Sequence, residues 1–265
     1  MKITNKSMRG TAGFTLVEIM ASMTIGVLCI ALTMSTFLFC MRAMYKDNQR
    51  LVTNASLRTF VSQISTETLN ASYFYLFPYY TKLDGSVDLA ADPVSLTLDD
   101  AAVDAYDRWI AHGDCLVLVT KTSEFRTTDI RQIRIYYRLT TNQTTTNNES
   151  PIRYYETADW GEGTSATSNS HPLSGLATEL NGINLNSTPL ITGSREMAAR
   201  TKGRAVPSPY TGYTAGDRYP VFSTESPTAN NTNGFVSINV EFINGTTNSN
   251  MLSSSSFNYT ISPRR

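Results

Sequence analysis

A long apolar run occupies the first part of the chain. It extends from Phe14 to Met41 and contains a single charged residue, Glu18. As a helix rising about 1.5 Å per residue, this run would span roughly 42 Å, which exceeds the hydrocarbon core of a bilayer at about 30 Å. The pattern therefore predicts a membrane-spanning helix.

After Met41 the apolar positions follow the period of an amphipathic helix. Residues 42–69 contain no Pro or Gly, and Leu57, Val61 and Ile64 recur at the spacing of one helix face. Charged side chains, namely Asp47, Arg50, Arg58 and Glu67, are distributed among the polar positions of this segment. We expect one continuous helix over about 14–69.

Beyond Pro78 the pattern changes to period two, which is typical of strands. The aromatic residues 73–77 just before this proline are predicted to end the helix and to cover its junction with the next domain. The predicted strands are 94–98, 116–120, 133–138, 152–157, 236–242 and 257–261. An Asn-Gly turn at Asn244 and Gly245 and other short connections favour antiparallel pairing.

Two short helices and two loops complete the prediction. Residues 101–111 place apolar side chains on one helix face before Gly113, and residues 195–200 are rich in helix-forming types. The Thr/Asn tract 140–150 is predicted to be a loop. The interval 160–234 is rich in Gly, Ser, Thr, Asn and Pro, so we expect a long loop region or surface insertion containing a few short elements.

These elements predict an α+β fold in which a long N-terminal helix, half membrane-spanning and half amphipathic, packs on an antiparallel β-sheet. The expected organisation is a basic leader over 1–13, an apolar helix over 14–41, its amphipathic continuation over 42–72, and an external β-rich domain over 73–265. The external part is long enough for one moderate globular domain.

Charge gives little reason to expect a nucleic-acid partner, because 22 basic and 22 acidic residues leave the chain neutral. The basic cluster 195–204, with Tyr210 and Tyr213 after it, is interpreted as a solvated loop rather than a single-strand binding patch. The aspartates of the interval 84–114 are interpreted as a solvated acidic face. No cofactor is expected, although Ca²⁺ bound in this acidic interval stays open as an alternative.

The leader sets the expected orientation. Lys2, Lys6 and Arg9 precede the apolar run without any acidic residue, which by the positive-inside rule places the amino end in the cytoplasm and the external domain outside. The boundary between leader and run reads Gly-Phe-Thr-Leu-Val-Glu over Gly13 to Glu18. This hexapeptide resembles the class III signal of type IV prepilins and type II secretion pseudopilins.

The resemblance implies a processing route and a set of partners. A prepilin peptidase would cut after Gly13 and N-methylate Phe14, and Glu18 would take part in assembly with other pilin or pseudopilin subunits on an inner-membrane platform. An acid inside hydrocarbon is costly without a partner, and the amine freed at Phe14 of a neighbouring subunit would supply one. The alternative is that Glu18 lies near enough to the interface to stay hydrated.

The implied function is a structural subunit in the bacterial inner membrane, with its C-terminal domain periplasmic before it joins a filament. The implied shape is the ladle of type IV pilin-like subunits. A further resemblance, to J-type minor pseudopilins and W-type minor pilins, is carried by Gly113 and Asp114 before an apolar strand and by the Tyr-Tyr-Arg-Leu segment 136–139. A tip adhesin or a DNA-uptake subunit is the alternative function.

Catalysis is not expected. The two histidines, His112 and His171, stand apart from each other and from any cysteine at metal-binding spacing, and no phosphate-binding loop or nucleophile motif occurs. Cys29 and Cys40 lie too far apart along the predicted helix to form a disulfide. Cys115 is predicted to be a buried thiol on a strand.

Overall fold

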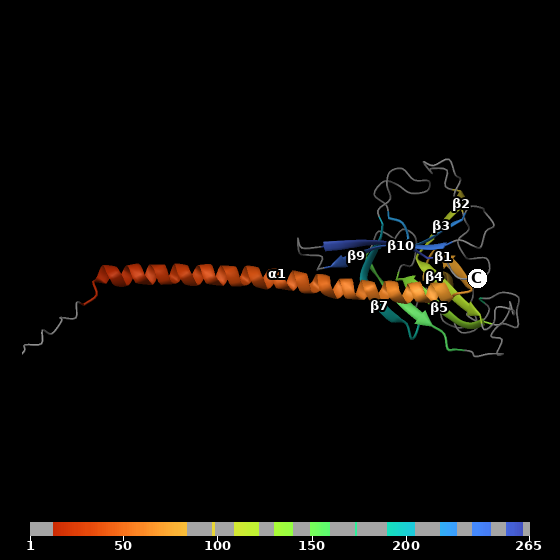
Figure 1. Ribbon diagram of the computed structural model, residues 1–265, viewed down its shortest axis with the longest axis horizontal. Helices are drawn as coiled ribbons and strands as arrows, with labels where there is room; N and C mark the ends of the chain where they lie inside the picture. The colour runs from red at the N-terminus through yellow and green to blue at the C-terminus, as the bar shows by residue number, and fades with distance from the viewer. Residues whose placement is uncertain are drawn as a thin grey trace, which may run out of the picture. The chain divides into compact units, whose positions relative to one another are not determined.

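Helix α1, Leu16–Asn70, is the dominant element and agrees with the predicted continuous helix (Figure 1). The computed structural model of the protein describes residues 13–83, 97–98, 109–121, 130–139, 149–159, 173, 190–204, 218–226, 235–244 and 253–261. By its internal contacts the chain divides into two compact units, Met1–Gln49 and Arg50–Arg265. The helix contributes residues to both units, which are described separately below.

In the first unit, α1 exposes its apolar side chains. Its most hydrophobic 18-residue window has a mean hydropathy of 2.1, and none of that window is buried. Large side chains such as Ile25, Leu32 and Phe39 are 60%, 68% and 73% exposed. By length and composition, this is a helix able to cross a membrane.

In the second unit, the carboxyl-terminal part of α1 packs on a sheet. Phe60, Ile64 and Thr68 are fully buried, while Leu57 and Val61 are partly buried against the same core. The predicted face of the helix is therefore confirmed, with Phe60 at its centre. Its ring meets Tyr136 and Phe242 edge to face, each at a centroid separation of 6.1 Å.

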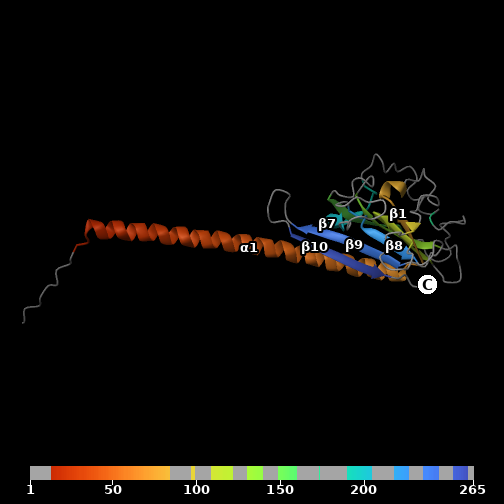
Figure 2. The same cartoon turned by 90° about the horizontal axis from the view of Figure 1, so that it is seen from above.

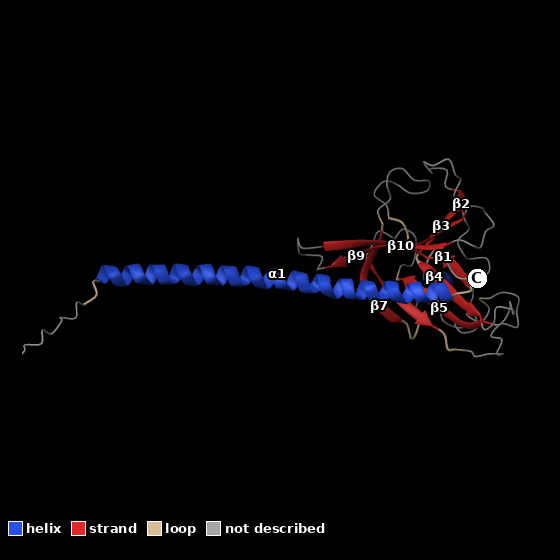
Figure 3. Cartoon of the chain, in the orientation of Figure 1, coloured by secondary structure: helices blue, strands red, loops and turns tan. Residues whose placement is uncertain are grey.

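The described strands form one ten-stranded antiparallel sheet (Figure 3). Its order is β1-β4-β5-β6-β7-β9-β8-β3-β2, with β10 paired to the free side of β9. The strands are β1 (Tyr73–Phe77), β2 (Thr97–Leu98), β3 (Trp109–Gly113), β4 (Cys115–Lys121), β5 (Ile130–Arg138), β6 (Ser150–Glu156), β7 (Arg195–Gly203), β8 (Phe222–Ser226), β9 (Phe235–Asn244) and β10 (Ser253–Ile261). A 3₁₀ turn, η1, covers Tyr80–Leu83.

Strand β9 joins the two parts of the sheet. One of its edges pairs with β10, while the other pairs with β7 at residues 240–242 and with β8 at residues 235–238. Strands β7 and β8 therefore follow one another along the same edge of β9. Figure 2 shows β8, β9 and β10 side by side, as this pairing requires.

Strands β4 and β5 are covered on both faces. Leu116 and Leu118 belong to the core beneath α1, whereas Val117 and Val119 belong to a second core on the opposite face. The second core also contains Cys115, which is fully buried on its strand as predicted. A strand buried on both faces needs no polar alternation, which explains the continuous apolar run in the sequence.

Most of the predicted strands are confirmed, and the antiparallel arrangement is confirmed throughout the described pairs. Of the predicted strand 94–98, residues 97–98 form β2 and the rest lies outside the described residues. The predicted loop 140–150 is described only at Glu149 and Ser150, and Ser150 already belongs to β6.

The aromatic segment 73–77 is a strand and not a cap. Strand β1 pairs along its whole length with β4, from Tyr73 opposite Val119 to Phe77 opposite Cys115. Four aromatic side chains favour strand structure, and the turn at residues 71–72 is enough to leave the helix.

Both predicted short helices are wrong where the structure describes them. Residues 109–113 form β3 between β2 and β8, while residues 101–108 lie outside the described part. Residues 195–203 form β7 between β6 and β9. In each case backbone pairing on both sides outweighs a local preference for helix.

The interval 160–234 contains secondary structure as expected, and the described elements are the strands β7 and β8 of the sheet. Its basic cluster lies on β7 rather than in a loop, where Arg200 and Lys202 both pair with Glu149. The remainder of the interval, including Tyr210 and Tyr213, lies outside the described residues apart from Leu173, residues 190–194, Arg204 and residues 218–221.

Candidate processing and assembly site

The start of α1 is built by a reciprocal contact between Thr15 and Glu18. The backbone N–H of Thr15 donates to Oε2 of Glu18 at 2.9 Å, and the Thr15 hydroxyl donates to the same oxygen at 3.0 Å. The N–H of Glu18 in turn donates to the Thr15 hydroxyl oxygen at 3.3 Å. This is a capping box, in which two backbone donors at a helix start receive side-chain acceptors.

The predicted processing residues lie immediately before this cap. Gly13 and Phe14 precede the helix, and the Phe14 side chain is 84% exposed. A Cβ placed on Gly13 would meet no atom within 4 Å. The peptide bond between the two residues is thus in non-helical chain, next to a helix start that Glu18 stabilises.

Sequence reasoning assigned Glu18 an intersubunit role and missed its contact with Thr15. The signal was present, because Thr15-Leu-Val-Glu18 matches the Ser/Thr-x-x-Glu pattern of a capping box before an apolar run. A carboxylate held by its own chain also tolerates an apolar setting better than an isolated one.

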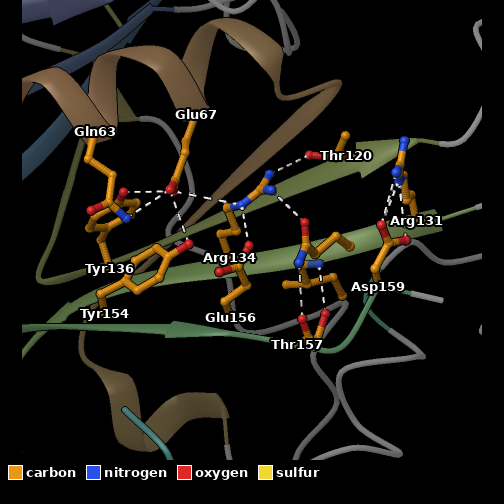
Figure 4. A network of polar contacts seen from close by, with 12 residues as sticks. Gln63, Glu67, Thr120, Arg131, Arg134, Tyr136, Tyr154, Glu156, Thr157 and Asp159 are labelled. Carbon is orange, nitrogen blue, oxygen red and sulfur yellow. Dashed lines mark hydrogen bonds and ion pairs between the residues drawn. The ribbon is translucent and has the colours of Figure 1, made fainter. Parts of the chain in front are cut away.

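A second polar site connects α1 to the sheet through Glu67, as Figure 4 shows. The hydroxyls of Tyr136 on β5 and Tyr154 on β6 donate to Oε2 and Oε1 of Glu67 at 2.7 Å and 3.1 Å. The Gln63 amide donates to Oε1 at 2.8 Å. The Glu67 side chain is only 15% exposed, although the sequence pattern put it at a polar position of the helix.

Arg134 and Arg195 complete the charge balance around Glu67. Nε of Arg134 lies 3.9 Å from Oε2 of Glu67 and donates to Glu156 at 3.0 Å. Arg195 donates to the Gln63 side-chain oxygen at 3.0 Å, and its guanidinium carbon lies 4.8 Å from the centre of the Tyr154 ring. This set of residues, the Glu67 network, holds one carboxylate between helix and sheet with charged and neutral donors.

Asp114 is the described member of the acidic interval, and it is not solvated. It is 1% exposed, and its carboxylate receives a hydrogen bond from the N–H of Val221 at 2.9 Å. The Arg138 guanidinium lies 3.6 Å away. The other aspartates of the interval 84–114 lie outside the described residues, and so does the Ca²⁺ alternative that rests on them.

The remaining candidate residues are scattered. His112 lies on β3 with its ring stacked on Tyr219 at a centroid distance of 4.8 Å, and His171 lies outside the described residues. Cys29 and Cys40 are exposed on α1. Within the described ranges, no group of three or more His, Cys, Asp and Glu side chains is placed to hold a metal ion.

The geometry at the start of α1 coincides with a recognised motif. Residues 8–34 match the family model of the prokaryotic N-terminal methylation motif, which covers Gly13, Phe14, Glu18 and the first turns of the helix. Comparison with curated proteins and with solved structures found no match. The motif and the exposed apolar helix define a class III prepilin signal.

Over residues 8–34 the chain is similar to type IV pilin-like proteins. The match ends at residue 34, so it does not distinguish a pilus subunit from a secretion pseudopilin.

Proposed function

We propose that the chain is a structural subunit of a type IV pilus or of a type II secretion pseudopilus. It is cut by a prepilin peptidase between Gly13 and Phe14 and methylated on the new Phe14 amine. The observation that carries this proposal is the methylation motif at residues 8–34 together with the apolar part of α1, in which the 18-residue window long enough to span a membrane has no buried residue. Such a surface needs either lipid or other apolar helices around it.

In the proposed topology the chain crosses the inner membrane once before assembly. The three cations of the leader keep the amino end in the cytoplasm, and the sheet domain lies in the periplasm. On entry into the filament, contacts with sister helices replace contacts with lipid around the first unit.

Glu18 has a proposed role in two states. In the single chain it accepts the Thr15 hydrogen bonds described above. In the filament the same carboxylate also faces the cationic Phe14 amine of a neighbouring subunit, which fixes the axial register between the two. The pairing favours the assembled state, because the partner charge is supplied by another chain.

A minor-subunit role is favoured by one structural relationship. The Gly113-Asp114 pair and the Tyr-Tyr-Arg-Leu segment, which carry the resemblance to J-type and W-type subunits, lie side by side. The backbone N–H of Arg138 donates to the Asp114 carbonyl at 2.8 Å, next to their ion pair. Two sequence features 24 residues apart thus form one structural unit.

The processing step is tested by expressing the full chain with and without a prepilin peptidase and measuring the intact mass. With the peptidase we expect loss of residues 1–13 and gain of one methyl group on Phe14. Gly13→Val should block both changes, whereas the matched control Gly26→Val, within α1, should leave cleavage intact. A wild-type chain that still begins at Met1 in the presence of an active peptidase would contradict the proposal.

A further inference from the structure

The face of β3, β8, β9 and β10 that points away from α1 carries a groove of about 490 Å³. Residues alternate along β9 between the two faces. Val236, Ile238 and Val240 belong to the core beneath α1, whereas Ser237 and Asn239 line the groove. The groove is formed within the second unit, and its volume falls in the usual range for small-molecule sites.

The floor of the groove consists of small, neutral polar side chains. The hydroxyls of Ser237 and Thr260 lie 2.9 Å apart, and the Asn239 amide donates to the Ser223 hydroxyl at 3.2 Å. Ser223 and Ser237 are only 4% and 6% exposed. These pairs fix the orientation of hydroxyl and amide groups, each of which retains further hydrogen-bonding capacity.

Aromatic rings and two opposite charges form the sides. The His112 and Tyr219 rings stack with an interplanar angle of 19°, and Phe235 also lines the groove. Arg204 and Glu225 add one positive and one negative side chain. Tyr219 is held in place by its N–H, which donates to the Arg204 carbonyl at 3.0 Å.

We propose that this groove binds a short neutral oligosaccharide. Rows of hydroxyl and amide groups match the many donors and acceptors of a sugar, and flat aromatic rings match the apolar face of a pyranose. Among the described lining residues the one positive and the one negative side chain cancel, which favours a ligand without net charge.

Nucleic acid fits this groove poorly. Single-strand sites combine stacking rings with several cations that follow the phosphates, whereas here Arg204 is balanced by Glu225. A peptide that adds a strand binds along a sheet edge, whereas this groove lies over the face of strands that are paired with one another. The proposal does not depend on the processing or assembly of the chain.

The test uses the full chain in a polyoxyethylene detergent, which has no sugar head group. The probes are cellotetraose, chitotetraose and maltotetraose, with tetra-alanine and a short oligothymidylate as competing classes. We expect saturation-transfer signals from the ring protons of at least one tetrasaccharide, with dissociation constants near or below about 1 mM. Absence of binding by all three, or preferred binding of the peptide or oligonucleotide, would overturn the proposal.

Two variants locate the binding. Tyr219→Ala removes an aromatic side and Arg204→Gln removes a donor at the edge, and each should weaken binding by roughly tenfold. The control Arg131→Gln changes an exposed arginine on β5 that pairs with Asp159 outside the groove, so it should bind as the wild type does. Retained protection of the buried Cys115 thiol verifies that each variant is folded. Equal binding by all the variants would place the sugar elsewhere and contradict the assignment.

Discussion

Oδ2 of Asp114 lies 3.6 Å from Nε of Arg138, and the two side chains are 1% and 0% exposed. Burial lowers the pKa of the Arg138 guanidinium, and the Asp114 charge opposes that effect. Asp114 lies between β3 and β4, and Arg138 is the last residue of β5. A charge pair without solvent depends on both members, because either one alone is an uncompensated charge in the protein interior.

Asp114→Asn should therefore destabilise the second unit by about 3–5 kcal/mol. The measurement is the denaturant midpoint of the full chain in detergent, followed by near-ultraviolet circular dichroism. Asp159→Asn is the matched control, because its partner Arg131 is 52% exposed and such a pair contributes less than about 1 kcal/mol. Similar losses of stability from the two substitutions would show that the buried pair contributes no more to stability than the exposed pair.

Removing Glu67 should loosen α1 from the sheet. In Glu67→Ala the hydroxyls of Tyr136 and Tyr154 lose their acceptor, at a cost of about 1–3 kcal/mol. Hydrogen exchange of the backbone amides over 57–68 should accelerate. Thr66→Ala, an exposed change on the same helix, should leave exchange close to wild type. Unchanged protection in Glu67→Ala would mean that the apolar contacts of Phe60 and Ile64 are sufficient to keep the helix packed on the sheet.

Alkaline pH should destabilise the folded sheet domain. Burial, followed by the nearby Glu67 charge, raises the pKa of Tyr136 and of Tyr154, and burial raises the pKa of Tyr75 to about 12. Above pH 10 or so the unfolded chain releases phenol protons that the folded chain retains, so stability is full below that pH and declines above it.

The check is the tyrosinate absorbance of the folded chain between pH 9 and 13, compared with the chain in denaturant. We expect a delayed component in the folded protein that appears together with unfolding. Tyr136→Phe should remove part of that component. Simultaneous ionisation of all tyrosines in folded and denatured chains would contradict the expectation.

Gly203 should not tolerate a side chain. A Cβ at this position on β7 would lie 1.6 Å from the carbonyl oxygen of Tyr219, so the backbone must shift. Gly203→Ala should cost about 1–3 kcal/mol or more in overpacking, and the unfolding midpoint should fall accordingly. Gly26→Ala is the control, because no atom lies within 4 Å of the added carbon. A normal midpoint for Gly203→Ala would disprove the close approach of β7 to Tyr219.

Substitutions at Thr15 and Glu18 distinguish the effect of the helix cap from the effect of the proposed contact between subunits. Thr15→Ala removes the side-chain half of the capping box, which costs about 1 kcal/mol at a helix start, but it keeps the carboxylate. We expect Thr15→Ala subunits to enter filaments and Glu18→Ala subunits to stay in the membrane, as measured by sheared-filament fractionation. Equal loss in both variants would assign Glu18 to helix capping alone.

The sequence predicts α1 and several strands because the spacing of apolar residues along the chain determines these elements. The alternation in β9 reflects faces that differ in polarity, and the apolar run of β4 reflects burial on both faces. Strands β7 and β8 have no such signature. Residues 195–200 contain helix formers, and only the neighbouring edges of β6 and β9 impose an extended backbone on them.

The polar sites differ in the same way. Glu67 lies seven residues after Phe60 and three after Ile64, so its place on the buried helix face was available from spacing alone. The capping box was likewise a local pattern. The partner of Asp114 could not be predicted from local spacing. Arg138 comes next to Asp114 only because the register of β4 and β5 pairs Cys115 with Tyr137.

Strand β9 has partners along both edges, and it comes late in the chain. Translation and export proceed from the amino end, so the strands that precede β9 emerge without the segment that links them. On the proposed route across the membrane, the periplasmic sheet therefore cannot be completed until almost the whole polypeptide has crossed. A chain truncated before residue 235 would lack the strand that joins β7 to β8.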